Sequence, residues 1–289
     1  MERLTGLDAS FLYLENPTNH MHVAMTMVLE PHTMPGGYSF DKIKEALHDF
    51  LEAVPRAKVK LIPFGTEIDT VLFAVGYDRT AAHSQEEVFV DGLRNVLAKV
   101  RPYCRRFIYI SSTSVYGQQD GSWVDETSPC EPTQPGGIYC LAAERLVRES
   151  CPQSIILRCA GIYGPGRLLS RIADLRAGSP LAGSPESWLN LIHVDDAATA
   201  VLAASEAVLP PPIVLVVDDQ PLKRVDYYAQ LAQLVGAPTP RFDEAQPRSR
   251  GSGGLNKRCR NRRLKDDLHV ALQYPTTAVG LRAAMQDNS

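Results

Sequence analysis

Short apolar runs alternate with helical patterns from about residue 65 to the C-terminus. The apolar runs typical of buried strands lie at 71–75, 107–110, 154–159 and 213–217. Segments with apolar residues at helical spacing follow them at 85–100, 141–149, 197–207 and 225–235. This order predicts a parallel sheet covered by helices. Because such sheets bind ligands at the carboxyl ends of their strands, the residues that follow the strands are the first candidates for a site.

The first 64 residues have a different character. Residues 22–28 alternate as in a strand, and a Pro-Gly-Gly turn signal follows at 35–37. Ser39 is a candidate N-cap for a helix with apolar positions at helical spacing over 40–51. We therefore expect two domains, an α+β segment at 1–64 and an α/β domain at 65–289.

Composition and charge exclude several classes of protein. The chain has 289 residues, of which 44% are hydrophobic and 22% charged, as in ordinary globular proteins. The net charge of -3 gives no general attraction for nucleic acid. The basic run at 257–263 is the local exception; we interpret it as a solvated helix face, with a phosphate-binding patch as the alternative.

Targeting signals and metal motifs are not evident in the sequence. No apolar stretch approaches the roughly 20 residues that span a bilayer, and the N-terminus lacks a signal-peptide pattern. The six cysteines include no close pair at metal-ligand spacing, so no metal site is expected. They indicate reduced thiols, and we expect a cytoplasmic protein.

Five segments in order resemble one family. They are 69–76 (DTVLFAVG), 91–97 (DGLRNVL), 108–117 (IYISSTSVYG), 157–167 (LRCAGIYGPGR) and 190–197 (NLIHVDDA). Together they resemble the extended short-chain dehydrogenases/reductases of the NAD-dependent epimerase/dehydratase type. The resemblance implies an α/β fold, an incomplete doubly wound Rossmann-like parallel sheet with a small C-terminal substrate lobe.

The chemistry implied by the resemblance is hydride transfer coupled to proton transfer. The family uses a serine, a tyrosine acid/base and a lysine four residues after the tyrosine. That lysine matters because a free tyrosine titrates near about 10, and a positive charge lowers this pKa. Here Ser112 occupies the serine position, but Gly136 and Cys140 occupy those of the tyrosine and lysine.

Tyr139 remains as a candidate catalytic acid, although Ala143 stands four residues after it. The alternative for Tyr139 is a tyrosine packed at a helix start. Cys140 is either a nucleophile or, as we prefer, a buried thiol.

The resemblance also implies binding residues. The expected cofactor-binding residues are Ala74, Val75, Gly76, Ser111, Cys159, Ala160 and Gly161, and the expected substrate-side residues are Arg167, Asn190 and His193. His193 has an alternative role in linking the two lobes. The cofactor would be NAD or NADP. Its binding would be weak or absent, since no Gly-x-x-Gly-x-x-Gly or Gly-x-Gly-x-x-Gly loop precedes Asp69 to hold the pyrophosphate.

The front of the chain resembles a second family. Residues 4–15 (LTGLDASFLYLE), 17–23 (PTNHMHV) and 35–40 (PGGYSF) resemble the N-terminus of bacterial wax ester synthase/diacylglycerol acyltransferases. That family depends on a His-His-x-x-x-Asp-Gly motif, and no adjacent His pair exists here. Both resemblances stop near residues 63–66, which indicates a fused or truncated reading frame or a chimera.

Three functions therefore stay open. The first is an NAD(P)-dependent epimerase, dehydratase or reductase acting on a sugar or other small carbonyl or hydroxyl compound, with activity reduced or lost. The second is an acyltransferase-related fragment, and the third a non-catalytic or degenerate binding protein. The expected partners are a small-molecule substrate and, because unpaired strands favour pairing with another chain, a second copy of the protein.

Overall fold

A four-stranded parallel sheet forms the centre of the protein. The computed structural model describes residues 68–77, 83–165, 169–245 and 255–286. The sheet order is β1 (Ile68–Phe73), β2 (Cys104–Ser112), β4 (Ile155–Cys159) and β9 (Ile213–Val216). Leu72 pairs with Ile108, Ile110 with Leu157, and Leu157 with Val214. The elements expected within 1–64, the loop at 246–254 and Arg167 lie outside the described residues.

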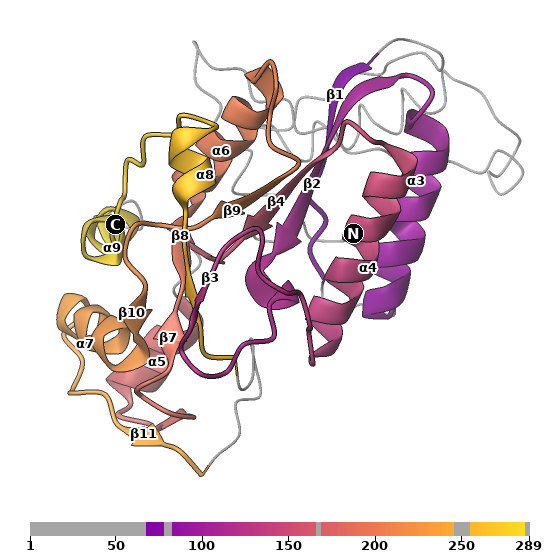
Figure 1. The fold of residues 1–289 in the computed structure, drawn as a ribbon. Coiled ribbons are helices and arrows are strands. Elements are labelled where there is room, and N and C mark those ends of the chain that lie inside the picture. The colour runs from indigo at the N-terminus through magenta and orange to yellow at the C-terminus, as the bar shows by residue number, and fades with distance from the viewer. Residues whose placement is uncertain (1–67, 78–82, 166–168, 246–254, 287–289) are drawn as a thin grey trace, which may run out of the picture.

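Helices cover both faces of this sheet (Figure 1). On one face lie α3 (Gly92–Val100) and α4 (Pro135–Ser150), and on the other α6 (Val194–Glu206) and α8 (Arg262–Asp266). Phe107 packs with the α3 and α4 core, whereas the adjacent Ile108 packs with the α6 core. Strand residues alternate between faces, so an apolar run without polar gaps is what a sheet buried on both sides requires.

A smaller lobe follows the sheet strands. It contains the helices α5 (Leu169–Arg176), α7 (Arg224–Leu234) and α9 (Thr277–Gln286). Its short strand pairs are β5 (Gly161–Tyr163) with β8 (Leu191–His193), β6 (Leu181–Ala182) with β11 (Phe242–Asp243), and β7 (Trp188–Leu189) with β10 (Leu222–Lys223). A separate core cluster holds it together, including Tyr163, Leu175, Leu231 and Leu281. The expected Rossmann-like sheet with a small second lobe is confirmed.

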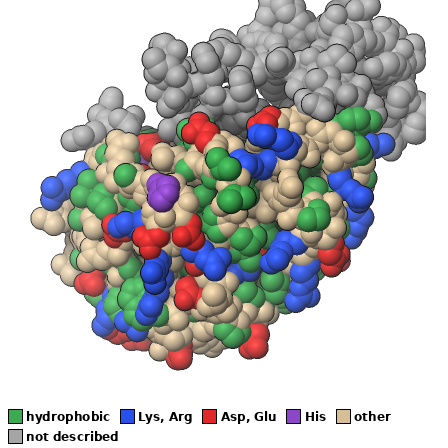
Figure 2. All heavy atoms as spheres, turned by 45° about the horizontal axis from the view of Figure 1, so that its top comes forward, with side chains coloured by type: hydrophobic (Ala, Val, Ile, Leu, Met, Phe, Trp, Pro, Cys, Tyr) green, Lys and Arg blue, Asp and Glu red, His purple; other side chains and the backbone are tan. Residues whose placement is uncertain are grey.

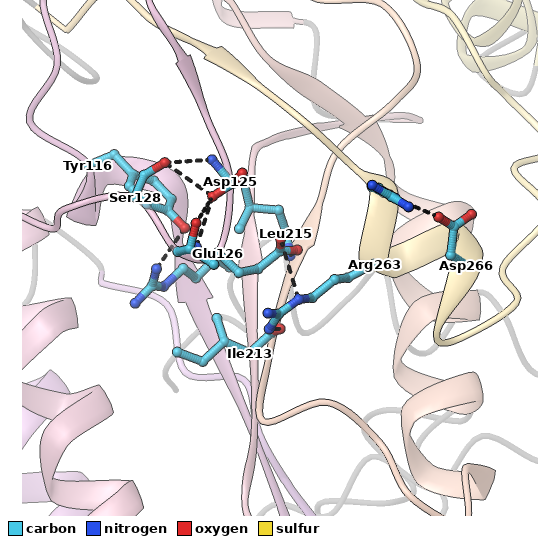
Figure 3. A network of polar contacts seen from close by, with 11 residues as sticks. Tyr116, Asp125, Glu126, Ser128, Ile213, Leu215, Arg263 and Asp266 are labelled. Atoms are coloured by element: carbon cyan, nitrogen blue, oxygen red, sulfur yellow. Dashed lines mark hydrogen bonds and ion pairs between the residues drawn. The ribbon is translucent and has the colours of Figure 1, made fainter.

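The outer edge of β9 is closed by side chains instead of another strand (Figure 3). The Glu126 carboxylate accepts the N–H of Leu215 at 2.8 Å. Arg263 donates to the carbonyl of Ile213 at 3.3 Å and lies 3.9 Å from the Glu126 carboxylate. The two side chains satisfy backbone groups that an open sheet edge would leave to pair with another chain.

One predicted helix boundary needs correction. The helix expected at 141–149 is α4, which begins six residues earlier, at Pro135. Proline suits the first helical position, where no N–H partner is required, so Pro135 can begin the helix. The helix at 85–100 is present, with a π-helical turn at Glu87–Asp91.

The basic run at 257–263 is not a solvated helix face. Arg258–Cys259 forms β12, which pairs in parallel with β3 (Trp123–Val124), and only Arg262–Asp266 is helical. Lys257 is buried, with 4% of its surface exposed. Because this charged segment pairs with β3, which lies far away in sequence, it packs against the rest of the domain.

On the face shown in Figure 2, Lys and Arg side chains are interspersed with Asp and Glu. None of the helices in the described part of the chain is both long and apolar enough to cross a membrane. Across the same residues, no group of three or more His, Cys, Asp and Glu side chains is arranged to hold a metal ion.

Candidate functional site

The carboxyl ends of β1, β2 and β4 meet at one edge of the sheet. Ala74, Val75 and Gly76 follow β1, β2 ends at Ser112, and β4 ends at Cys159. Ser112 is the register partner of Cys159, and Phe73 is that of Tyr109. The segment 74–76 therefore runs beside the end of β2. The structure thus brings together the candidates that the sequence placed after separate strands.

Ser111 and Ser112 have different environments, as expected for consecutive strand residues. The Ser111 hydroxyl is buried and donates to Oε1 of Glu144 at 2.5 Å. Ser112 is half-buried, and its Oγ accepts the N–H of Ser114 at 3.1 Å, which caps the short turn Thr113–Val115. This bond leaves the hydroxyl hydrogen of Ser112 available to a ligand.

A buried polar network lies directly behind these serines. Arg158 donates to both carboxylate oxygens of Glu144, with a closest distance of 2.7 Å, and to the Tyr116 hydroxyl at 2.6 Å. Burial raises the pKa of Tyr116 although Arg158 is adjacent, so its phenol is neutral at physiological pH. The network was not foreseen, but Arg158 inside the otherwise apolar run 155–159 was its one visible signal.

The start of α4 presses against the end of β2. A Cβ atom at Gly137 would lie 2.3 Å from the Ser114 carbonyl oxygen, so only glycine permits this approach. A Cβ at Gly136 would meet nothing within 4 Å. The position that corresponds to the family's tyrosine therefore opens onto free space. Tyr139 lies one turn further along, half-buried.

Cys140 and Cys159 are unreactive thiols in this environment. Cys140 is 8% exposed, and burial, reinforced by the nearby Glu144, raises its pKa to about 11. Burial alone raises the pKa of Cys159 to about 12. Both are protonated near neutral pH, and a thiol is a poor nucleophile compared with a thiolate. The geometry agrees with the interpretation of Cys140 as a buried thiol.

Ala160 and Gly161 carry the chain from β4 into the small lobe. The Ala160 N–H binds the carbonyl of Val216 at 3.0 Å, and the Gly161 N–H binds that of Asn190 at 3.1 Å. A Cβ at Gly161 would lie 2.9 Å from a methyl group of Leu191. Leu191 therefore packs directly against the backbone of Gly161, which a larger residue at this position would prevent.

Asn190 holds two distant backbone segments together. Its Nδ2 donates to the carbonyl of Lys257 at 2.9 Å, and its Oδ1 accepts the N–H of Cys259 at 2.7 Å. The amide is therefore engaged in positioning the segment 257–259.

His193 is 1% exposed and begins α6, where its Nδ1 accepts the N–H of Asp195 at 3.3 Å. Its ring packs against Tyr163 and Tyr274, with centroids 5.3 and 3.9 Å away. These contacts agree with a role in linking the two lobes.

The described residues could hold one half of a dinucleotide, the nicotinamide half. Residues 74–76 and 160–161 lie with Ser112 at the carboxyl edge of the sheet, where doubly wound sheets bind such ligands. The pyrophosphate half has no counterpart in the sequence, since residues 1–68 contain no glycine-rich loop of the dinucleotide-binding type.

Comparisons with known proteins find relatives of two kinds. The model of the NAD dependent epimerase/dehydratase family matches residues 38–217, so the match begins before the expected domain boundary at residue 65. Protein YeeZ of Escherichia coli K12 is 32% identical over 175 residues, which are 60% of each chain. A putative diacyglycerol O-acyltransferase of Mycobacterium tuberculosis, Rv1760, is 41% identical over 69 residues, 24% of this chain and 14% of that protein. The chain thus spans only a part of either relative.

Two solved structures show the same fold. A conserved protein of unknown function from Silicibacter pomeroyi DSS has a TM-score of 0.66 and 32% identity, covering 83% of this chain and 87% of the other. The UDP-glucuronic acid 4-epimerase of Bacillus cereus in complex with NAD has a TM-score of 0.60 at 20% identity, covering 76% and 72%. The second likeness, at this identity, supports the fold alone.

Proposed function

Because the chain belongs to the NAD-dependent epimerase/dehydratase family, we propose that it binds NAD or NADP at the carboxyl edge of its sheet. There it acts on a sugar or other small carbonyl or hydroxyl compound, with reduced activity. The observation that carries this proposal is the convergence of Ala74–Gly76, Ser112 and Ala160–Gly161 on one edge. Small residues at these positions allow a planar ring to approach the backbone closely.

Each candidate has a role in this proposal. NAD(P), when bound, supplies the hydride donor or acceptor. Ala74, Val75 and Gly76 would hold the cofactor together with the backbone of Ser111 and with Cys159 to Gly161. Ser112 would donate its hydroxyl hydrogen to the substrate oxygen. The family resemblance assigns Arg167 to the substrate side, and Asn190 and His193 would support that side from the interior.

In this proposal proton transfer is the slow step of the reaction. Tyr139 is the phenol nearest to the expected position, but Ala143 follows it at the place of the lysine. A phenol exchanges its proton efficiently at neutral pH only when a neighbouring cation stabilises the phenolate. We therefore propose slow turnover, limited by the proton and not by the hydride.

Fluorescence titration of the purified protein with NADH and with NADPH tests this proposal. We expect saturable binding in the micromolar range for one of the two. The variant Val75→Glu places a negative charge on a residue that is 46% exposed beside the cofactor edge, so binding should weaken at least tenfold. Val208→Glu is the matched control, since Val208 is 89% exposed at the opposite, amino end of β9. No binding of either nucleotide at millimolar concentration would exclude the proposal.

An acyltransferase activity is the second candidate, supported by the 69-residue match to Rv1760. The sequence has no His-His-x-x-x-Asp-Gly motif to supply a general base. We expect no ester from an acyl-CoA and a fatty alcohol. Measurable ester formation would replace the dehydrogenase proposal with this one.

A further inference from the structure

Lys257 lies on a short extended segment beside the candidate site. Residues 256–260 run parallel to 118–124, with the N–H groups of Asn256, Arg258 and Arg260 bonded to the carbonyls of Gln118, Ser122 and Val124. Leu255, Lys257 and Cys259 are 5%, 4% and 2% exposed, whereas the residues between them are not buried. Since side chains alternate along an extended segment, Lys257 points to the same inner face as Cys259.

That inner face belongs to the carboxyl edge of the sheet. Cys259 packs in one cluster with Ala160 and Cys140. Asn190 connects the two regions, because its side chain binds the backbone at 257 and 259 and its carbonyl binds the N–H of Gly161. Asn190 therefore connects the backbone of Lys257 with the backbone of Gly161 at the candidate site.

The other cations of this basic run, and Lys265 just after it, each contact another side chain or a carbonyl. The Arg260 guanidinium lies 5.3 Å from the centroid of the Trp123 ring. Arg258 donates to the Gly121 carbonyl at 2.8 Å, with its guanidinium between the Trp123 and Trp188 rings. The ion pairs are Arg262 with Asp266, Arg263 with Glu126 and Lys265 with Asp219. These charges are satisfied within the protein.

Lys257 differs from these cations. Among the residues that the structure describes, no hydrogen bond or ion pair of its ammonium group is found. The ammonium nitrogen is not one of the fully buried polar atoms that lack a partner, so the stem is buried while the nitrogen reaches solvent. Burial still lowers the pKa of the Lys257 ammonium, opposed by the adjacent Cys259. A lysine with a buried stem and a solvent-accessible nitrogen can bind an oxyanion at that point of the surface.

We propose that Lys257 is the anion-binding residue of the site and that its ammonium pairs with a phosphate or carboxylate oxygen of the bound ligand. The proposal rests on the proposed function, which places that ligand at the carboxyl edge of the sheet. The oxyanion comes either from the cofactor or from the substrate. An ammonium is a compact point charge and binds either group by charge-assisted hydrogen bonds.

Thermal unfolding in inorganic phosphate, compared with sodium chloride at equal ionic strength, tests this proposal. Phosphate should raise the melting temperature of the natural protein by a few degrees, because it binds only the folded state. Lys257→Met keeps the length of the stem and removes the charge, so the phosphate-specific rise should vanish. Lys257→Arg should retain it, and so should the control Lys265→Met, which changes a partly exposed lysine paired with Asp219. An equal rise in all four proteins would overturn the proposal.

Acetylation of the natural protein gives the same test without a variant. Acetic anhydride labels unprotonated lysines, and mass spectrometry reports each site. Phosphate or succinate should slow the labelling of Lys257 but not that of Lys265; equal rates with and without either anion would overturn the proposal.

The two sources of the anion give different patterns. Protection by NADH or NADPH assigns the cofactor, and protection by phosphate or succinate alone assigns the substrate. Failure of NADH and NADPH to bind while phosphate still protects Lys257 would reject the cofactor proposal and leave the anion site intact.

Discussion

The carboxylate of Glu144 and the guanidinium of Arg158 form an ion pair of 2.7 Å inside the protein, with each side chain at most 4% exposed. Glu144 lies on α4 and Arg158 on β4, so the pair fixes the helix that carries Gly136, Tyr139 and Cys140 against the sheet. The hydroxyls of Ser111 and Tyr116 complete its hydrogen bonds. The ion pair thus supports the edge of the sheet at which the candidate site lies.

Replacing one partner of this ion pair should lower the free energy of unfolding far more than replacing both. Glu144→Leu or Arg158→Met leaves one buried charge unpaired, which costs about 3–5 kcal/mol. The double variant should recover most of that loss, because no isolated charge remains. Urea denaturation of the three variants measures the coupling. Additive losses in the double variant would show that the two residues do not act as a pair.

Replacing each of the two adjacent glycines at the start of α4 by alanine should change the stability of the protein in opposite directions. At Gly136 the added methyl group meets open space, so Gly136→Ala should stabilise the helix by about 0.5–1 kcal/mol. At Gly137 the same methyl group would lie 2.3 Å from the Ser114 carbonyl oxygen, and Gly137→Ala should destabilise by about 1–3 kcal/mol. Thermal unfolding measures both, and equal effects would contradict this helix start.

Asp218 should make the stability depend on pH. It is 1% exposed, and burial, with the nearby Asp219 and Asp196, raises its pKa to about 8. The folded state keeps this proton up to pH about 8, whereas the unfolded chain loses it above about 4. The contribution of Asp218 is therefore complete below the unfolded pKa and is lost as the pH rises through that window.

The variant Asp218→Asn isolates this effect. The natural protein should lose up to about 1.4 kcal/mol per pH unit relative to the variant as the pH rises from about 5 to about 8. Chemical denaturation at several pH values gives the difference. Parallel pH profiles for the two proteins would mean that Asp218 is ionised in the folded state.

Glu126 should protect the outer edge of β9. Glu126→Ala removes the acceptor of the Leu215 N–H, and an unsatisfied buried donor costs about 1–3 kcal/mol. Glu126→Gln keeps an acceptor oxygen and should lose less. Denaturation measures the loss, and light scattering reports self-association through the open edge. If the Glu126→Ala protein stayed monomeric and lost no stability, the edge of β9 would not depend on the hydrogen bond from Leu215 to Glu126.

The order of the sheet elements was predictable, but the long-range contacts were not. The apolar runs at 107–110 and 213–217 identified buried strands because period and length are local properties. The start of α4 was placed too late, because the close approach of Gly137 to the Ser114 carbonyl joins two segments that are not adjacent in sequence.

The site was predictable to a similar extent. Its place at the carboxyl edge follows from the alternation of strands and helices, and the roles of single residues came from the family resemblance. The burial of Lys257 was missed because pairing of β12 with β3 joins residues far apart in sequence. The Glu144–Arg158 pair was missed for the same reason.

Hydrogen–deuterium exchange with and without saturating NADH or NADPH tests the central claim most directly. Binding at the carboxyl edge should slow amide exchange in residues 74–76, 110–117 and 159–163 together, since all three segments line one edge. Exchange in α7 and in the loop at 207–212 should not change. Unchanged exchange at the edge, or protection confined to other segments, would contradict the proposed site.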